Sequence, residues 1–392
     1  MKLILLCVFL FSFVSAREIN PDSIYFRQNS KSFLTLTNAK LDLYRYAGAF
    51  EADSDVAFFG WISPSKLFYV KESDNPLYFV CIEYDVSKRS KRELFRYNGI
   101  VQSAKASQDG RFIAVKRMTR EGYRKFTTEI IIRDLQKNVS DILYPKNPFS
   151  EFSYDNSSNL IYEKNGILEY NPFMRKERII LKKEKYSPGQ NGSVSAYLSP
   201  SASFLFLLAG GGGSYKASIF KNGSLYAEVE GVTSASEAGW LNENEVFFRR
   251  GGIGNYSLCA FSHSSRTYRN ISPSSYNTAS VFSRERVSFS VNGSAGYFDS
   301  LSSAVRMLPL DGEELSFSHD KNIFGVLFAK RLFIAGISDV STSEYRLKKM
   351  MMEISGIYKK TLEAESDWEN SYASDYIKKK IEIYNTYNRE NK

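Results

Sequence analysis

The chain has 392 residues, a formal net charge of +9, an aromatic content of 15% and only three cysteines and two histidines. This length suits one large or two ordinary domains, and the few prolines argue against disorder. So few cysteines exclude a disulfide-built scaffold, and the cysteines and histidines together are too few for most zinc sites. We therefore predict neither a metal site nor a cofactor.

Residues 1–16, MKLILLCVFLFSFVSA, place Lys2 before an apolar run that is too short to cross a bilayer and ends in small residues. This pattern predicts a secretory signal peptide cleaved before Arg17, with a short membrane anchor as the alternative. We expect a secreted or periplasmic protein. After export, the positive charge favours an acidic protein, an anionic envelope polymer or lipid head groups as partners, rather than nucleic acid.

Seven copies of one pattern, a small polar turn followed by a short apolar strand, occupy residues 46–340. The intervals between copies are 36 to 48 residues, measured at the first apolar residue after each turn: Leu67, Phe112, Leu160, Phe204, Val246, Val287 and Ile323. A period near forty without helical spacing is typical of four-stranded propeller blades. We predict an all-β fold, a seven-bladed β-propeller.

The second copy can be divided into strands. We expect strands at 102–107 and 111–118, joined by the tight turn Gln108-Asp109-Gly110, and further strands at 127–135 and 139–143. Glycine suits this turn because it readily adopts positive φ. The stretch from Ser107 to Ala114 resembles the Ser-Pro-Asp-Gly turn of the TolB-like propeller repeat, a relative of the WD-repeat class. The resemblance implies a propeller over residues 46–340 and no specific function.

The seventh copy shows only three strands, at 314–318, 322–329 and 331–337. The ring must still close, because an unpaired sheet edge is a template for aggregation. The N-terminal segment, residues 17–45, contains the alternating run 32–43, SFLTLTNAKLDL. We expect this run to supply the missing outer strand.

Residues 341–392 have a different pattern from the repeats. Two capping-box sequences, beginning at Ser341 and Ser366, precede apolar residues at helical spacing. We predict a C-terminal appendage of two amphipathic helices. These helices could pack on the propeller or bind a partner, including a peripheral association with a membrane or an envelope complex.

The stretch 207–220, LLAGGGGSYKASIF, contains four consecutive glycines in the fourth copy. It does not match a phosphate-binding loop, because Lys216 follows Tyr215 and the next residues alternate like a strand. We interpret the glycines as a bare loop tip between a second strand ending near Leu208 and a third beginning near Ala217.

The equivalent loops of the second and fifth copies are rich in arginine and tyrosine. Loops at these positions emerge on one face of a propeller, and arginine pairs well with carboxylates and phosphates. We therefore predict an anion-binding surface, with ordinary solvated loop tips as the alternative. Its residues are Arg117, Arg120, Tyr123, Arg124, Lys125, Tyr215, Lys216, Arg249, Arg250 and Tyr256.

Cys81 and Cys259 are expected in the third strands of the first and fifth blades. Blades that far apart cannot bring two cysteines within bonding distance, so we predict two buried, free thiols.

No hydrolase motif occurs in the sequence. We predict a noncatalytic binding or scaffolding protein. A glycan hydrolase with paired carboxylates at the propeller pore is an alternative, because such pairs leave no linear motif. A structural protein that docks through its C-terminal helices is a third reading.

Overall fold

A computed structural model describes residues 49–336, except 74, 76–77, 122–124, 188–191, 212–213, 253–254, 273–277, 284–285, 292–293, 312–313 and 329. The predicted signal peptide, the run 32–43 and the two C-terminal helices lie outside the described residues. Phe50–Ser338 form one compact unit.

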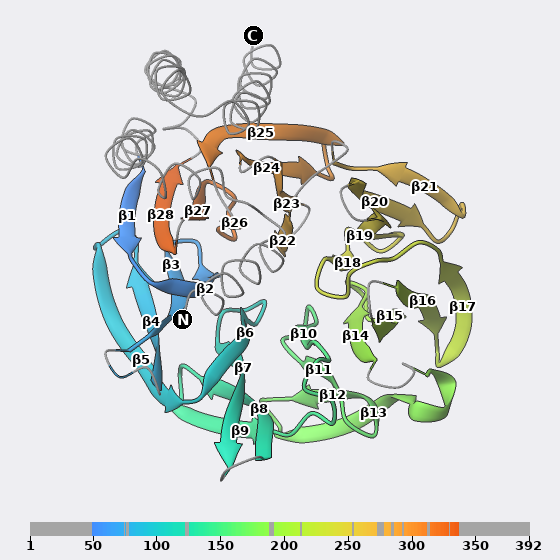
Figure 1. The fold of residues 1–392 in the computed structure, drawn as a ribbon, viewed down its shortest axis with the longest axis horizontal. Coiled ribbons are helices and arrows are strands. Elements are labelled where there is room, and N and C mark those ends of the chain that lie inside the picture. The colour runs from blue at the N-terminus through green and yellow to red at the C-terminus, as the bar shows by residue number, and fades with distance from the viewer. Residues whose placement is uncertain are drawn as a thin grey trace, which may run out of the picture. The chain divides into compact units, whose positions relative to one another are not determined.

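Within this unit, seven antiparallel four-stranded sheets follow one another around a ring (Figure 1). We call them blades 1 to 7. Their strands, from the ring axis outward, are β2 (Val56–Ser63), β3 (Lys66–Glu72), β4 (Tyr78–Asp85) and β5 (Ser90–Asn98) in blade 1; β6 (Ile100–Ala106), β7 (Phe112–Glu121), β8 (Lys125–Asp134) and β9 (Val139–Leu143) in blade 2; and β10 (Ser153–Tyr154), β11 (Leu160–Glu163), β12 (Gly166–Asn171) and β13 (Lys176–Lys182) in blade 3. A 3-10 helix, η1 (Lys183–Lys185), follows β13.

The remaining blades have the same order. They contain β14 (Ser193–Leu198), β15 (Phe204–Gly211), β16 (Ser214–Lys221) and β17 (Ser224–Val229) in blade 4; β18 (Ala238–Trp240), β19 (Glu245–Gly252), β20 (Asn255–Ser262) and β21 (Thr267–Asn270) in blade 5; β22 (Thr278–Ser283), β23 (Arg286–Val291), β24 (Ser294–Asp299) and β25 (Ala304–Asp311) in blade 6; and β26 (Glu314–Phe317), β27 (Ile323–Phe328), β28 (Arg331–Gly336) and β1 (Phe50–Asp53) in blade 7. The predicted all-β, seven-bladed propeller is confirmed.

The ring closes through β1, which pairs antiparallel with β28, with Phe50 opposite Ile334 and Asp53 opposite Leu332. The prediction that an N-terminal strand completes the last blade is correct, but the strand is Phe50–Asp53 and not the run 32–43. The reason is positional: β1 leads into β2 through only two residues, so it reaches the open edge of blade 7 directly.

Asp53 connects this closing strand to blade 1. Its carboxylate accepts hydrogen bonds from Tyr69 Oη at 2.5 Å and Lys71 Nζ at 3.0 Å, and lies 2.9 Å from Lys91 Nζ. Burial would raise the pKa of Asp53, but these partners outweigh it and lower the pKa to about 2. The closure therefore combines a strand pair with a charged contact between two blades.

One end of the ring carries the turns between first and second strands and the hairpins between third and fourth strands. We call it the turn end. In blades 2, 3, 4 and 7, the fourth residue of the first turn has positive φ and donates its N–H to the carbonyl of the first: Gly110, Ser158, Ala202 and Lys321. At Gly110 a side chain is excluded, because a Cβ would lie 1.7 Å from the carbonyl oxygen of Ile62.

The opposite end carries the second-to-third hairpins and the links between blades. We call it the loop end. The predicted loop tip of blade 4 is shorter than expected, because β15 and β16 stay paired as far as Gly211 and Ser214. The reason is Gly210, whose missing Cβ would otherwise lie 2.4 Å from the carbonyl oxygen of Ser214. Glycine thus extends this hairpin instead of loosening it.

Apolar clusters fill the spaces between neighbouring blades. One cluster joins Phe206 and Ile219 of blade 4 to Phe248 and Phe261 of blade 5. Side chains also satisfy backbone carbonyl groups on the inner strand of the preceding blade, as in the 2.8 Å bond from Trp240 Nε1 to the carbonyl oxygen of Tyr197. Such bonds compensate for the missing neighbour at each inner sheet edge.

The two cysteines of the described residues lie where the blade assignment predicts. Cys81 is in β4 of blade 1 and Cys259 in β20 of blade 5, and both thiols are free and buried. Burial raises the pKa of the Cys81 thiol.

Candidate binding surfaces

Arg117, the first residue of the predicted anion-binding surface, is bound inside the protein. Its Nε and Nη2 donate to Glu129 Oε2 at 2.9 and 2.6 Å, and Nη1 donates to the Asn98 carbonyl and side chain at 2.7 and 2.8 Å. The residue is only 8% exposed. These contacts use four of the five guanidinium donors. Arg117 therefore stabilises the β7–β8 hairpin and its link to blade 1.

Arg249 has a similar role in blade 5. Its Nη1 lies 2.7 Å from Glu237 Oε2, Nη2 donates to the Thr233 carbonyl at 3.1 Å, and the guanidinium lies 4.4 Å from the centre of the Tyr256 ring. The neighbouring Arg250 stacks on Tyr268 at 5.0 Å. The two arginines therefore hold the link between blades 4 and 5.

The other predicted residues that the structure describes lie on blades 2 and 4. Lys216 on β16 is exposed and pairs with Glu228 at 3.2 Å, and Tyr215 beside it is half-buried. Arg120 and Lys125 lie near the ends of β7 and β8, at the loop end. Tyr123 and Arg124 lie outside the described residues. The structure thus brings basic residues of blades 2, 4 and 5 towards one end, as the repeat predicts, and anion binding by them stays a prediction.

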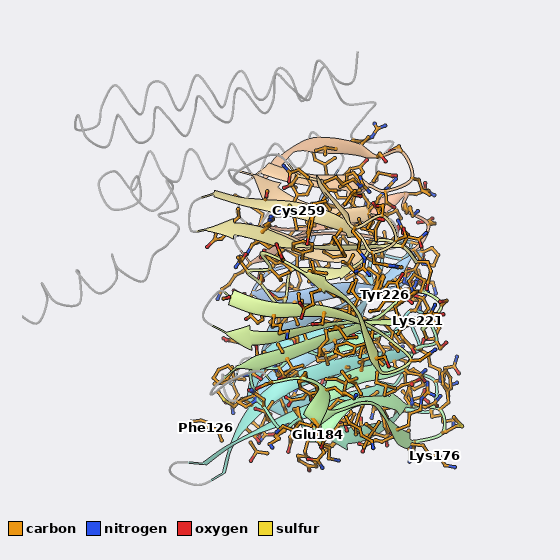
Figure 2. The ribbon with its side chains drawn as sticks, turned by 90° about the vertical axis from the view of Figure 1, so that its right-hand side faces the viewer. Phe126, Lys176, Glu184, Lys221, Tyr226 and Cys259 are labelled. Carbon is orange, nitrogen blue, oxygen red and sulfur yellow. The ribbon has the colours of Figure 1, made fainter. Side chains whose placement is uncertain are left out.

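Exposed apolar side chains at the loop end are a feature that sequence reasoning missed. Five of them, between 41% and 68% exposed, belong to connections of blades 1 to 3: Tyr78, Ile100, Phe126, Tyr144 and Phe149. Figure 2 shows Phe126 at the edge of the propeller opposite Lys176 and Lys221. The sequence offered one indication that these side chains are exposed. Each of them lies at a strand end or in a link between strands, and not within an alternating apolar run.

A second missed feature is a pair of lysines between blades 2 and 3. Lys116, fully buried, donates to the Ser150 carbonyl at 2.7 Å and lies 3.8 Å from Glu151 Oε1, and Lys105 donates to the Phe152 carbonyl at 2.6 Å. Burial lowers the pKa of both lysines, and Glu151 partly offsets this effect. Both amines hold the segment that leads into the two-residue strand β10.

Two carboxylates near the starts of inner strands are matched by cations. Glu151 precedes β10 and faces Lys116, and Glu237 precedes β18 and faces Arg249. This arrangement favours structural ion pairs over the acid and base pair that a glycosidase needs. In the described parts of the chain, no three His, Cys, Asp or Glu side chains gather in a way that could hold a metal ion.

A search for membrane-spanning helices covers the same described residues. None of their helices has the length and apolar character needed to cross a bilayer.

No protein-family model matches the sequence, and a search of curated proteins finds no significant match. Solved structures do match. A prolyl endopeptidase superposes with a TM-score of 0.51 at 13% identity, over 81% of this chain and 53% of the endopeptidase, so the chain spans about half of that protein. The WD40 repeats of RRP9 superpose with a TM-score of 0.51 at 11% identity, over 74% of this chain and 97% of theirs.

TolB from Acinetobacter baumannii also matches, at 16% identity over 55% of this chain and 54% of TolB, but its TM-score of 0.39 is too low to support a conclusion. At these identities a match shows the fold alone. Together with the seven blades, the two superpositions with TM-scores of 0.51 confirm, at the level of the fold, the predicted resemblance to repeat propellers.

Proposed function

We propose that this protein is an exported, noncatalytic propeller that binds a partner protein through its loop end. The observation that carries the proposal is the set of exposed apolar side chains on blades 1 to 3: Tyr78, Ile100, Phe126, Tyr144 and Phe149. The general use of WD-repeat propellers as interaction scaffolds supports it. Export rests on the predicted signal peptide, residues 1–16.

The exposed side chains favour binding because contact between apolar surface and water is unfavourable in free energy. Removing apolar surface from water is worth about 25 cal/mol per Å², so side chains of this size gain free energy when a partner covers them. All five lie at the same end of the ring, on consecutive blades, where one partner could cover them together. Aromatic residues, which include Phe126 and Phe149, are also enriched in the buried centres of protein interfaces.

Charge at the same end also favours a protein partner. Lys182, Lys185 and Lys216 are exposed at or towards the loop end, while Arg117 and Arg249 are occupied by internal contacts. A partner with an apolar centre and an acidic rim would fit such a surface. Lysines at the rim would mainly speed association and make it sensitive to salt.

Site-specific photo-cross-linking in the source cell tests the proposal. A benzoylphenylalanine placed at Ile100, Phe126 or Phe149 should cross-link to one and the same protein. The control position is Ile179, which is exposed on the outer strand β13, away from both ends. Cross-links that are absent at all three positions, or equally strong at Ile179, would contradict the proposed surface.

A further inference from the structure

The turn end of blades 3 to 6 carries a second group of exposed apolar side chains. They lie in or directly after the hairpins between third and fourth strands, and their exposed fractions run from 39% to 74%: Met174, Leu225, Tyr226 and Leu301. Figure 2 shows Tyr226 on the same side of the propeller as Lys176 and Lys221, opposite Phe126. This group is separate from the loop end, so a ligand of the turn end does not depend on the proposed function.

Local hydrogen bonds fix the backbone at two of these residues. Asn171 Oδ1 accepts the Met174 N–H at 2.8 Å, and Asp299 Oδ1 accepts the Leu301 N–H at 3.1 Å. Both are turns closed by the side chain of the last residue of the third strand. The turns therefore present Met174 and Leu301 at the tips of ordered hairpins.

Basic side chains accompany the apolar tips. Lys137, Lys176, Lys221 and Arg266 are exposed in the hairpins of blades 2 to 5. Within the part of the chain that the structure describes, none of these four forms an ion pair. Arg266 donates one hydrogen bond to the Tyr226 carbonyl at 2.8 Å, and Lys221 lies 5.2 Å from the centre of the Phe204 ring. Acidic residues of the hairpins at this end are bound by other cations, in the pairs of Arg111 with Asp134 in blade 2 at 2.7 Å, Lys164 with Glu177 in blade 3 at 3.4 Å and Arg286 with Asp299 in blade 6 at 3.1 Å. The exposed charge of the hairpins of blades 3 to 5 is therefore positive.

We propose that the turn end of blades 3 to 6 docks onto the surface of an anionic phospholipid bilayer. Met174, Leu225 and Leu301 enter the head-group region, and Lys176, Lys221 and Arg266 pair with lipid phosphates. A flat surface can take up tips from several blades at once, because the hairpins all lie at the same end of the ring. Apolar insertion combined with electrostatic attraction is the usual basis of peripheral membrane binding.

Vesicle co-sedimentation of the full mature chain tests this proposal. We expect binding to vesicles of phosphatidylcholine with phosphatidylserine, much weaker binding to pure phosphatidylcholine, and a decline as sodium chloride is added. The double variant Lys176→Glu, Lys221→Glu should lower the partition constant by about tenfold or more. The variant Met174→Ser, Leu225→Ser should bind more weakly, and salt should remove the binding that remains.

Matched controls come from a single strand. Lys176 and Lys182 are the first and last residues of β13, and Ile179 lies between them. Lys182→Glu and Ile179→Ser should bind vesicles like the unmodified protein, and circular dichroism should show all variants folded. Equal binding to both vesicle types, or equal loss in Lys176→Glu and Lys182→Glu, would overturn the proposal. Capture of an acidic protein without vesicle binding would also overturn it and point to a protein partner.

Discussion

At the loop end, Arg117 and Arg249 are held by carboxylates and carbonyl oxygens, whereas at the turn end Lys176 and Lys221 are exposed. The loops and hairpins at both ends contain several basic residues. The difference lies in the neighbours. The loop-end arginines have a glutamate on an adjacent strand or link, whereas Glu177, beside Lys176, pairs with Lys164, and the contact of Lys221 is the ring of Phe204. Residue type alone therefore does not say whether a cation stabilises the fold or is available to a partner.

Removing Arg117 should have the largest effect on stability. Arg117→Ala leaves the Glu129 carboxylate, 12% exposed, without its partner. Breaking a buried ion pair in this way costs about 3 to 5 kcal/mol. We expect the free energy of unfolding, measured by guanidinium denaturation, to fall by that amount.

Lys216→Ala is the matched control for this experiment. Lys216 also forms an ion pair, but its side chain is 72% exposed and that of Glu228 is 55% exposed. Such pairs contribute about 0.2 to 1 kcal/mol. Equally small losses in both variants would mean that Arg117 is not structural and that the predicted anion-binding role should be restored to it.

The hairpin that contains Arg117 shows how much of the structure can be predicted from the sequence. The strands 111–118 and 127–135 follow from local turn chemistry. The register that places Arg117 opposite Glu129 does not follow from it and is known only from the structure. The closing strand could not be found in this way. Phe50 pairs with Ile334 at the far end of the repeats, and the alternating run 32–43 has the stronger strand pattern. Position in the ring, rather than local propensity, selects the strand.

The sequence likewise did not predict which individual side chains are exposed. Met174 and Lys116 lie in similar mixtures of apolar and basic residues, yet one is at a hairpin tip and the other is buried between two blades. The difference depends on which blade covers each position, and a single sequence does not contain that information.

Asp53→Asn extends the comparison to the closing strand and should have an intermediate effect. The contacts with Tyr69, Lys71 and Lys91 lower the pKa of Asp53 from 3.8 to about 2, which corresponds to about 2 kcal/mol of stability. This contribution is fully present above about pH 4 and disappears as the pH falls through 2, because protonation of the folded state then removes the charge. Denaturation of both proteins across this range measures it.

A nearby aspartate provides the control. Asp55 is exposed and lies two residues further along the chain. Asp55→Asn should change the free energy of unfolding by less than about 0.5 kcal/mol. If the difference between the Asp53 variant and the unmodified protein stayed constant down to pH 2, the ionised carboxylate would not be the source of the stabilisation.

The smallest effects on stability should come from the turn-end lysines. Lys176→Ala and Lys221→Ala remove exposed side chains, and we expect each to change the free energy of unfolding by less than about 0.5 kcal/mol. Lys221 lies 5.2 Å from the centre of the Phe204 ring, so its variant should show the larger of the two changes. A loss above about 2 kcal/mol in either variant would place these lysines in the same structural class as Arg117. The contrast between the two ends would then fail, because a cation that the fold needs is not free to serve a partner.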